Sequence, residues 1–147
     1  MNTDVMFSSK TGECETPQDL FDFLNGLFRF TLDAAATAEN AKCERYYTKE
    51  DDALVQVWDG RVWCNPPYGR EIGRFVEKGM NSALDKDAEN VVMLLPSRTD
   101  TRWWHEHVQG IASEVRFVKG RLKFEGGKHS APFPSAVIIY RPGESNV

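Results

Sequence analysis

The residues best suited to chemistry form the segment Asn65-Pro66-Pro67-Tyr68, which follows the apolar run Val62-Trp63-Cys64. The amide carbonyl of Asn65 and the backbone carbonyl of Pro66 could each accept one N–H of an exocyclic amino group, such as N6 of adenine. Proline fixes φ near −65°, so Pro66 and Pro67 would hold these acceptors rigidly. Tyr68 could stack on a base swung out of a duplex. The alternative is an ordinary turn after a strand, because Asn-Pro and Pro-Pro are common in turns.

The segments around this motif alternate between strand and helix patterns. Thr16 as cap and Pro17 as first residue begin a helix, whose expected apolar face comprises Leu20, Phe21, Phe23, Leu24, Leu27 and Phe28. Further helices are predicted over 71–84 and 101–108, and strands over 30–32, 61–64, 91–95, 114–118 and 136–140. We expect turns or short elements over 34–41, 53–57 and 58–60, a loop over 45–48, and a hairpin or loop over 120–128. This alternation predicts an α/β sheet with helices on both faces.

Polar residues follow three of the predicted strands. Asp33 follows 30–32, Asn65 follows 62–64, and Ser97-Arg98 follows 91–95. Ligands of open α/β sheets bind at the carboxyl ends of the strands. We therefore expect these residues to meet at one edge of the sheet.

Length and composition indicate a single globular domain. The protein has 147 residues and is 41% hydrophobic. We expect a flexible N-terminus over 1–14, one domain over 15–141 and a tail over 142–147. No apolar run approaches the roughly 20 residues that span a bilayer, and the N-terminus does not resemble a signal peptide. A cytoplasmic location without a membrane partner is expected.

Cysteine and histidine usage gives no sign of a metal site. Cys14, Cys43 and Cys64 are widely spaced, and no Cys-x-x-Cys is present. Cys64 is expected to be a packed thiol. Since the three histidines form no set with a carboxylate cluster, we expect no bound metal.

Charge is unevenly distributed along the sequence. The net charge is −4, with −7 over residues 1–60 and +3 over residues 61–147. The acidity argues against a nucleic-acid partner, whereas the second half could provide a local basic face. Candidates for contact with phosphates or base edges are Arg70, Arg98, Arg102, Arg121, Lys123 and Lys128, with solvated surface as the alternative. Phe133 could flank a target base or pack within its loop, and at least one of Trp103 and Trp104 should be core.

Asn65-Pro66-Pro67-Tyr68 resembles the signature of S-adenosylmethionine-dependent amino-methyltransferases, whose Asn form is typical of enzymes that methylate adenine N6 or a glutamine amide. Over about 15–141, the sequence also resembles a small phage-encoded family of DNA N-6-adenine methyltransferases. The similar stretches are 33–47, 63–69, 96–103, 120–124 and 131–135.

The resemblance implies S-adenosylmethionine as cofactor and assigns residues to it. Thr16 and Pro17 would contact its methionine end, Asp33 and Ala34 would form the cofactor loop, and Asp52 with Leu54 would meet its adenine. Asn65 would border the cofactor, and Glu39 is our assignment for its ribose. Alanines replace the usual Gly-x-Gly of the cofactor loop, whose missing side chains let the backbone approach a ligand.

The resemblance also implies a compact Rossmann-like sheet. The stretch from Asp33 to Asn65 is short for two further strand–helix units, so one strand is expected to be missing or reduced. The domain over 15–141 would be the catalytic domain. With no separate target-recognition domain, double-stranded DNA would be read by loops or by a second copy of the protein in a homodimer.

The implied activity is methylation of a flipped adenine at N6, catalysed by Asn65, Pro66, Pro67 and Tyr68, in the host cytoplasm and with protection from restriction as a biological role. Two alternatives stay open: a methyltransferase acting on glutamine amides or RNA, and a non-catalytic relic that binds DNA or protein.

Overall fold

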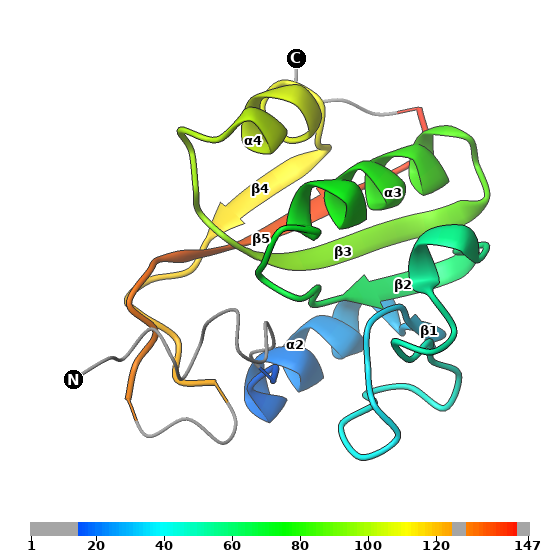
Figure 1. Ribbon diagram of the computed structural model, residues 1–147, viewed down its shortest axis with the longest axis horizontal. Coiled ribbons are helices and arrows are strands. Elements are labelled where there is room, and N and C mark those ends of the chain that lie inside the picture. Colours follow the sequence, from blue (N-terminus) through cyan, green and yellow to red (C-terminus); the bar gives the residue numbers. More distant parts are fainter. Residues whose placement is uncertain (1–14, 125–128, 144–147) are drawn as a thin grey trace.

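A mixed five-stranded sheet, in the order β1-β2-β3-β5-β4, runs through the molecule (Figure 1). This computed structural model describes residues 15–124 and 129–143, so the predicted flexible segment 1–14 lies outside the described residues. The strands are Leu32–Asp33 (β1), Gly60–Cys64 (β2), Ala88–Pro96 (β3), Glu114–Phe117 (β4) and Ser135–Tyr140 (β5). The first three are parallel, and β5 is antiparallel to both β3 and β4. The predicted α/β class is confirmed.

The parallel centre of the sheet is buried on both faces. β2 and β3 are joined in register, with Val62 opposite Val91 and Cys64 opposite Met93. All four of these side chains are fully buried. Near-continuous apolar runs are typical of parallel strands covered by helices on both sides, and both strands carry one.

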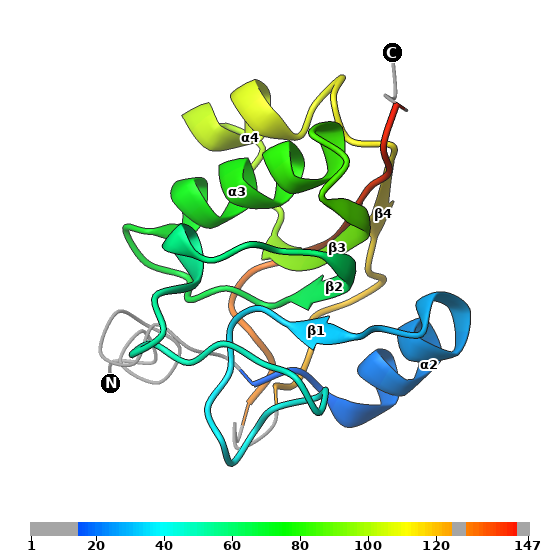
Figure 2. The same ribbon diagram turned by 90° about the vertical axis from the view of Figure 1, so that its right-hand side faces the viewer.

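Helices cover the two faces of this sheet (Figure 2). Helix α2 (Gln18–Phe28) packs on the face that carries Trp63, where the ring centroids of Phe21 and Trp63 are 5.5 Å apart. Helix α3 (Ile72–Leu84) covers the opposite face, and the short helix α4 (Arg102–His107) lies beside it. Trp104 of α4 is buried, as predicted for one of the two tryptophans.

β1 is an edge strand of only two residues. The segment between β1 and β2 contains turns and the 3₁₀ helix η1 (Ala53–Val55), but no strand. Beyond β1, Tyr46 forms an isolated parallel bridge with Asp33. This arrangement agrees with the expectation of a reduced strand on this side.

The start of α2 differs from the prediction. Pro17, not Thr16, is the N-cap residue, and no side-chain hydrogen bond caps the helix. Pro17 has an extended ψ of 131°, and its C=O accepts the N–H of Phe21 at 3.1 Å, so it sits half inside the helix. The hydroxyl of Thr16 instead accepts a hydrogen bond from Nδ2 of Asn65 at 3.0 Å.

The expected apolar face of α2 is also wider than the buried one. Phe21 and Leu24 are buried, whereas Phe23 and Leu27 are 65% and 60% exposed. Six apolar side chains spread too far around a helix for one sheet face to cover them all.

Within the described residues, no helix is both long and apolar enough to cross a bilayer.

Candidate active site

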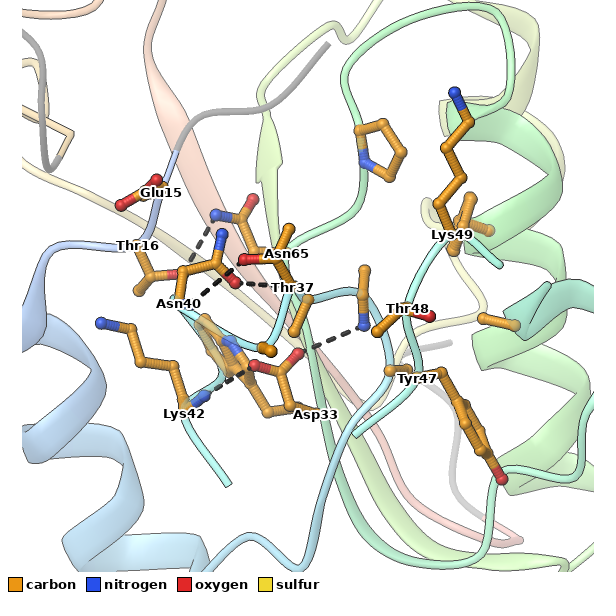
Figure 3. A pocket seen from close by; sticks show the side chains of 18 of the residues that line it. Glu15, Thr16, Asp33, Thr37, Asn40, Lys42, Tyr47, Thr48, Lys49 and Asn65 are labelled. Carbon is orange, nitrogen blue, oxygen red and sulfur yellow. Dashed lines mark hydrogen bonds between the residues drawn. The ribbon is translucent and has the colours of Figure 1, made fainter. Parts of the chain in front are cut away.

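A cavity of about 710 Å³ opens where β1 and β2 end (Figure 3). Its volume lies in the range of small-molecule sites. Asp33 at the end of β1 and Asn65 after β2 both line it. Because β1, β2 and β3 are parallel neighbours, Asp33, Asn65 and Ser97-Arg98 lie at the same edge of the sheet, as predicted. Of these residues, only Asp33 and Asn65 line the cavity.

Asp33 organises the loop that follows β1. Its side chain is 3% exposed, and its two carboxylate oxygens accept the backbone N–H groups of Ala35 at 3.2 Å and Lys42 at 3.0 Å. Burial raises the pKa of this carboxyl to about 6, and the two N–H donors limit the rise. The carboxylate therefore ties together the two ends of the loop.

The alanine-rich loop is braced by its own backbone. Ala34 donates its N–H to the carbonyl of Trp63, and Ala36 donates to that of Tyr47, both at 2.9 Å. Thr37 and Asn40 exchange hydrogen bonds between side chain and backbone, at 2.7 and 3.2 Å. These donors are used within the protein, and the residues of the loop that line the cavity are four alanines with Thr37, Glu39, Asn40 and Lys42.

The start of η1 forms another part of the wall. Asp52 and Leu54, which the resemblance assigns to the adenine of the cofactor, both line the cavity. Asp52 has a φ of 55°, a left-handed conformation that Asp tolerates better than most residues. Strained backbone of this kind is often found at functional sites.

The Asn-Pro-Pro-Tyr segment is anchored at both ends. Asn65 donates from Nδ2 to Thr16 Oγ1 at 3.0 Å, and Tyr68 donates its hydroxyl to the carbonyl of Leu94 at 2.9 Å. Tyr68 is 5% exposed, and its ring packs edge-on against Phe124 and Phe133, with centroids 6.2 and 5.7 Å away. Asn65 and Pro67 line the cavity, whereas Pro66 and Tyr68 do not.

The structure gathers most of the residues assigned to the cofactor. The cavity is lined by Thr16, Asp33, Ala34, Glu39, Asp52, Leu54 and Asn65, but not by Pro17. Lys42 and the segment 47–50 also line the cavity, and the sequence did not predict them as site residues. The Asp33–Tyr46 bridge carries this segment to the edge of the cavity, and a single residue pair leaves no strand pattern in the sequence.

The residues assigned to DNA do not line this cavity. None of Arg70, Arg98, Arg102, Arg121, Lys123 and Phe133 lines it, and Lys128 lies outside the described residues. Arg98 follows the carboxyl end of β3, where Ser97 donates its N–H to the carbonyl of Pro134 at 2.9 Å. Arg102 is paired with Glu106 at 2.8 Å.

Nearly the whole sequence is similar to known proteins. The model of the family described as DNA N-6-adenine-methyltransferase (Dam) matches residues 7–142. A DNA N-6-adenine-methyltransferase of Escherichia phage T1 is 34% identical over 110 residues, which cover 73% of this protein and 44% of the T1 protein. Another, of Haemophilus phage HP1 (strain HP1c1), is 30% identical over 135 residues, which cover 86% of this protein and 77% of the HP1 protein.

The match therefore spans less than half of the length of the T1 relative and about three quarters of the HP1 relative. The match of the family model extends over nearly all of the described residues and includes the cavity, the Asn-Pro-Pro-Tyr segment and the strands that position them. The predicted resemblance is confirmed, and the protein belongs to the DNA N-6-adenine-methyltransferase (Dam) family.

Proposed function

We propose that this protein methylates adenine at N6 in double-stranded DNA, with S-adenosylmethionine as cofactor. The observation that carries the proposal is the cavity bordered by both Asp33, the last residue of β1, and Asn65, which follows the adjacent parallel strand β2. The sheet would then be a reduced Rossmann-like methyltransferase sheet. In it, the Tyr46 bridge stands where a further parallel strand would pair.

The chemistry of the cavity wall suits this cofactor. S-adenosylmethionine supplies, when bound, a methyl group carried on a positively charged sulfur. Acidic side chains outnumber lysines on the wall, where they comprise Glu15, Asp33, Glu39, Glu50, Asp52 and Glu71 against Lys42 and Lys49. A wall of this charge favours a cationic ligand. Leu54 and the loop alanines provide apolar surface for an adenine ring.

The proposed role of Asn65 is to orient the amino group. Asn65 Oδ1 and the C=O of Pro66 would accept the two N–H groups of adenine N6. Electron density would return to the nitrogen, and its lone pair would be directed toward the cavity. Catalysis would depend on positioning and on electrostatics at the amino group.

The target base would have to leave the duplex to reach Asn65. Stacking on Tyr68 would require Phe124 or Phe133 to move, because both rings pack against Tyr68. The contacts to DNA would come from Arg70, Arg98, Arg102, Arg121 and Lys123, and a second copy of the protein could extend this surface. An enzyme of this kind would work in the host cytoplasm, where methylation could protect DNA from restriction.

Transfer of radiolabelled methyl from S-adenosylmethionine to duplex DNA tests the proposal, with RNA and protein substrates in parallel. We expect label in DNA as N6-methyladenine, lost in Asn65→Ala and kept in Asn81→Ala, a matched change on the exposed side of α3. Label on RNA or protein alone would support the alternative substrates. No label anywhere, together with no cofactor binding by calorimetry, would support a non-catalytic binding module.

A further inference from the structure

Lys42 lines the cavity and is held there through both its backbone and its side chain (Figure 3). Its backbone N–H donates to the carboxylate of Asp33 at 3.0 Å, and its ammonium donates to Oε1 of Gln18 at 2.6 Å. Nε2 of Gln18 donates in turn to Asp22 at 2.8 Å. Because an ammonium only donates and a carboxylate only accepts, one orientation of the Gln18 amide satisfies both contacts. The Lys42 ammonium is thereby held at the start of α2.

The ammonium of Lys42 keeps donors for a ligand. Gln18 takes one of its N–H groups, and an ammonium has others to offer. Within residues 15–124 and 129–143, no carboxylate forms an ion pair with Lys42. An anionic group of a ligand can therefore pair with Lys42 without displacing a carboxylate of the protein.

The proposed cofactor carries such a group. S-adenosylmethionine has one carboxylate, on its methionine part, at the end of the molecule away from the adenine. Backbone N–H groups of a loop can bind an anion, but here those of residues 34–37 and 40–42 all donate within the protein. The carboxylate therefore depends mainly on side chains, and the cationic ones on the cavity wall are Lys42 and Lys49.

These two lysines lie at different ends of the cavity wall. Figure 3 shows Lys42 on the same side of the cavity as Thr16, and Lys49 on the opposite side. The C=O of Lys49 accepts the N–H of Asp52 at 3.2 Å, which places Lys49 next to η1. Because η1 brings the apolar side chain of Leu54 to the wall, that end suits an adenine ring better than a carboxylate.

We propose that Lys42 binds the carboxylate of S-adenosylmethionine and so sets the direction of the cofactor, with its methionine part toward α2 and its adenine toward η1. This inference rests on the proposed function. It is consistent with the assignment of Thr16 to the methionine end and adds a residue that the sequence did not predict. Lys42 would thus distinguish ligands that carry this carboxylate from those that lack it.

The test compares two ligands that differ only in the carboxylate. S-adenosylhomocysteine, the demethylated cofactor, and its decarboxylated form are titrated by calorimetry into the wild-type protein and into Lys42→Gln, without DNA. The substitution removes the charge but keeps the backbone N–H that donates to Asp33, so the loop keeps this contact. Lys49→Gln is the matched control, because Lys49 also lines the cavity. It measures how far the loss of any nearby positive charge favours the more cationic, decarboxylated ligand.

We expect Lys42→Gln to weaken binding of S-adenosylhomocysteine about tenfold, the scale of one hydrogen bond to a charged group, and not to weaken binding of the decarboxylated ligand. Lys42→Arg should recover much of the loss, because it restores a cationic donor. Lys49→Gln should leave the ratio of the two affinities close to that of the wild type.

The outcomes separate this role from the proposed function. Binding of S-adenosylhomocysteine with the same affinity ratio in the wild type and in Lys42→Gln overturns the role of Lys42 alone. A change of ratio in Lys49→Gln as large as in Lys42→Gln does the same, because it indicates a general effect of charge. Failure of the folded wild-type protein to bind either S-adenosylhomocysteine or S-adenosylmethionine overturns the proposed cofactor and this role with it.

Discussion

Asp33 shows how one side chain can both stabilise a loop and line a cavity. It is the buried carboxylate of the described residues, and its two oxygens close the loop between Ala35 and Lys42. Burial raises its pKa from 3.8 to about 6. The folded protein therefore takes up a proton at this site more readily than the unfolded protein does.

This difference predicts how stability depends on pH. Between about pH 4 and about pH 6, Asp33 is ionised in the unfolded protein but largely protonated in the folded one. The contribution of Asp33 to the free energy of unfolding should fall across this window, by up to about 3 kcal/mol, and level off above it. Urea unfolding at a series of pH values would measure the fall, which should be smaller by that amount in Asp33→Asn. Parallel curves for the two proteins would contradict it.

Cofactor binding should show the opposite trend. A cationic ligand favours the ionised carboxylate, so the affinity for S-adenosylmethionine should rise between about pH 5 and about pH 7. Calorimetric titrations should give this rise in the wild type and a weaker, flatter affinity in Asp33→Asn. An equally steep rise in Asp33→Asn would mean that another group controls binding.

Tyr68 allows the hydroxyl and the ring to be tested separately. Tyr68→Phe removes the bond to the Leu94 carbonyl and should lower the free energy of unfolding by about 1 kcal/mol. Methyl transfer should persist, because the ring that could stack on a base remains. Urea unfolding and the DNA assay measure the two effects. Lost activity at unchanged stability would instead place the hydroxyl at the substrate.

At the scale of elements, the long and strongly patterned segments were predicted within a few residues. Helix α3 was expected over 71–84 and spans Ile72–Leu84, and β3 was expected over 91–95 and spans Ala88–Pro96. The Tyr46 bridge and the N-cap at Pro17 were not predicted. The bridge joins Tyr46 to Asp33, and the Thr16 hydroxyl that was expected to cap α2 is bonded to Asn65 instead. Local patterns do not encode such contacts between separate segments.

The same limit applies to the candidate site. The Asn-Pro-Pro-Tyr segment and Asp33 could be found from their residue types and from their places after strands. The Thr16–Asn65 bond and the packing of Tyr68 could not, because each joins segments that only the folded protein brings together.

The contact between α3 and the sheet gives a prediction at this scale. A Cβ on Gly79 would lie 2.8 Å from Met93 Sδ and 3.2 Å from Val91 Cγ1. Gly79→Ala should therefore push α3 away from β3 and destabilise the protein by about 1–3 kcal/mol. Gly26→Ala in α2, where nothing lies within 4 Å, should stabilise it by up to about 1 kcal/mol. Thermal unfolding of the two variants should shift in opposite directions, and equal shifts would contradict the close packing of α3.

Across the whole molecule, the acidic residues of the cavity wall come mainly from the net-negative part of the sequence, since five of the six lie within residues 1–60 and only Glu71 lies beyond it. All the acidic residues of the cavity wall precede position 72, and they lie near the ends of β1 and β2. Four of the basic residues assigned to DNA, at positions 98–123, lie after β3 and β4. A basic face formed by the second half of the sequence stays a prediction, and the sequence could not show which basic residues are already paired.

The ion pairs that the basic residues form predict how much each residue contributes to DNA binding. Arg98 and Arg121 form no ion pair with any described residue, whereas Arg102 is paired with Glu106 and Arg116 with Glu114. A guanidinium that already has a carboxylate partner must lose part of that interaction before it can bind a phosphate. Arg98 and Arg121 should therefore contribute more than Arg102.

Arg98→Ala and Arg121→Ala should each weaken binding to any duplex and reduce the magnitude of the salt-dependence slope by about 1. Arg102→Ala should have a smaller effect, and Arg116→Ala, on the edge strand β4, should have none. Fluorescence anisotropy with duplex DNA at several salt concentrations measures the slopes. Equal losses from Arg98→Ala and Arg116→Ala would mean that overall charge attracts the DNA. A loss confined to Arg98→Ala and Arg121→Ala would instead place the DNA across the end of β3, next to the segment that carries Asn65.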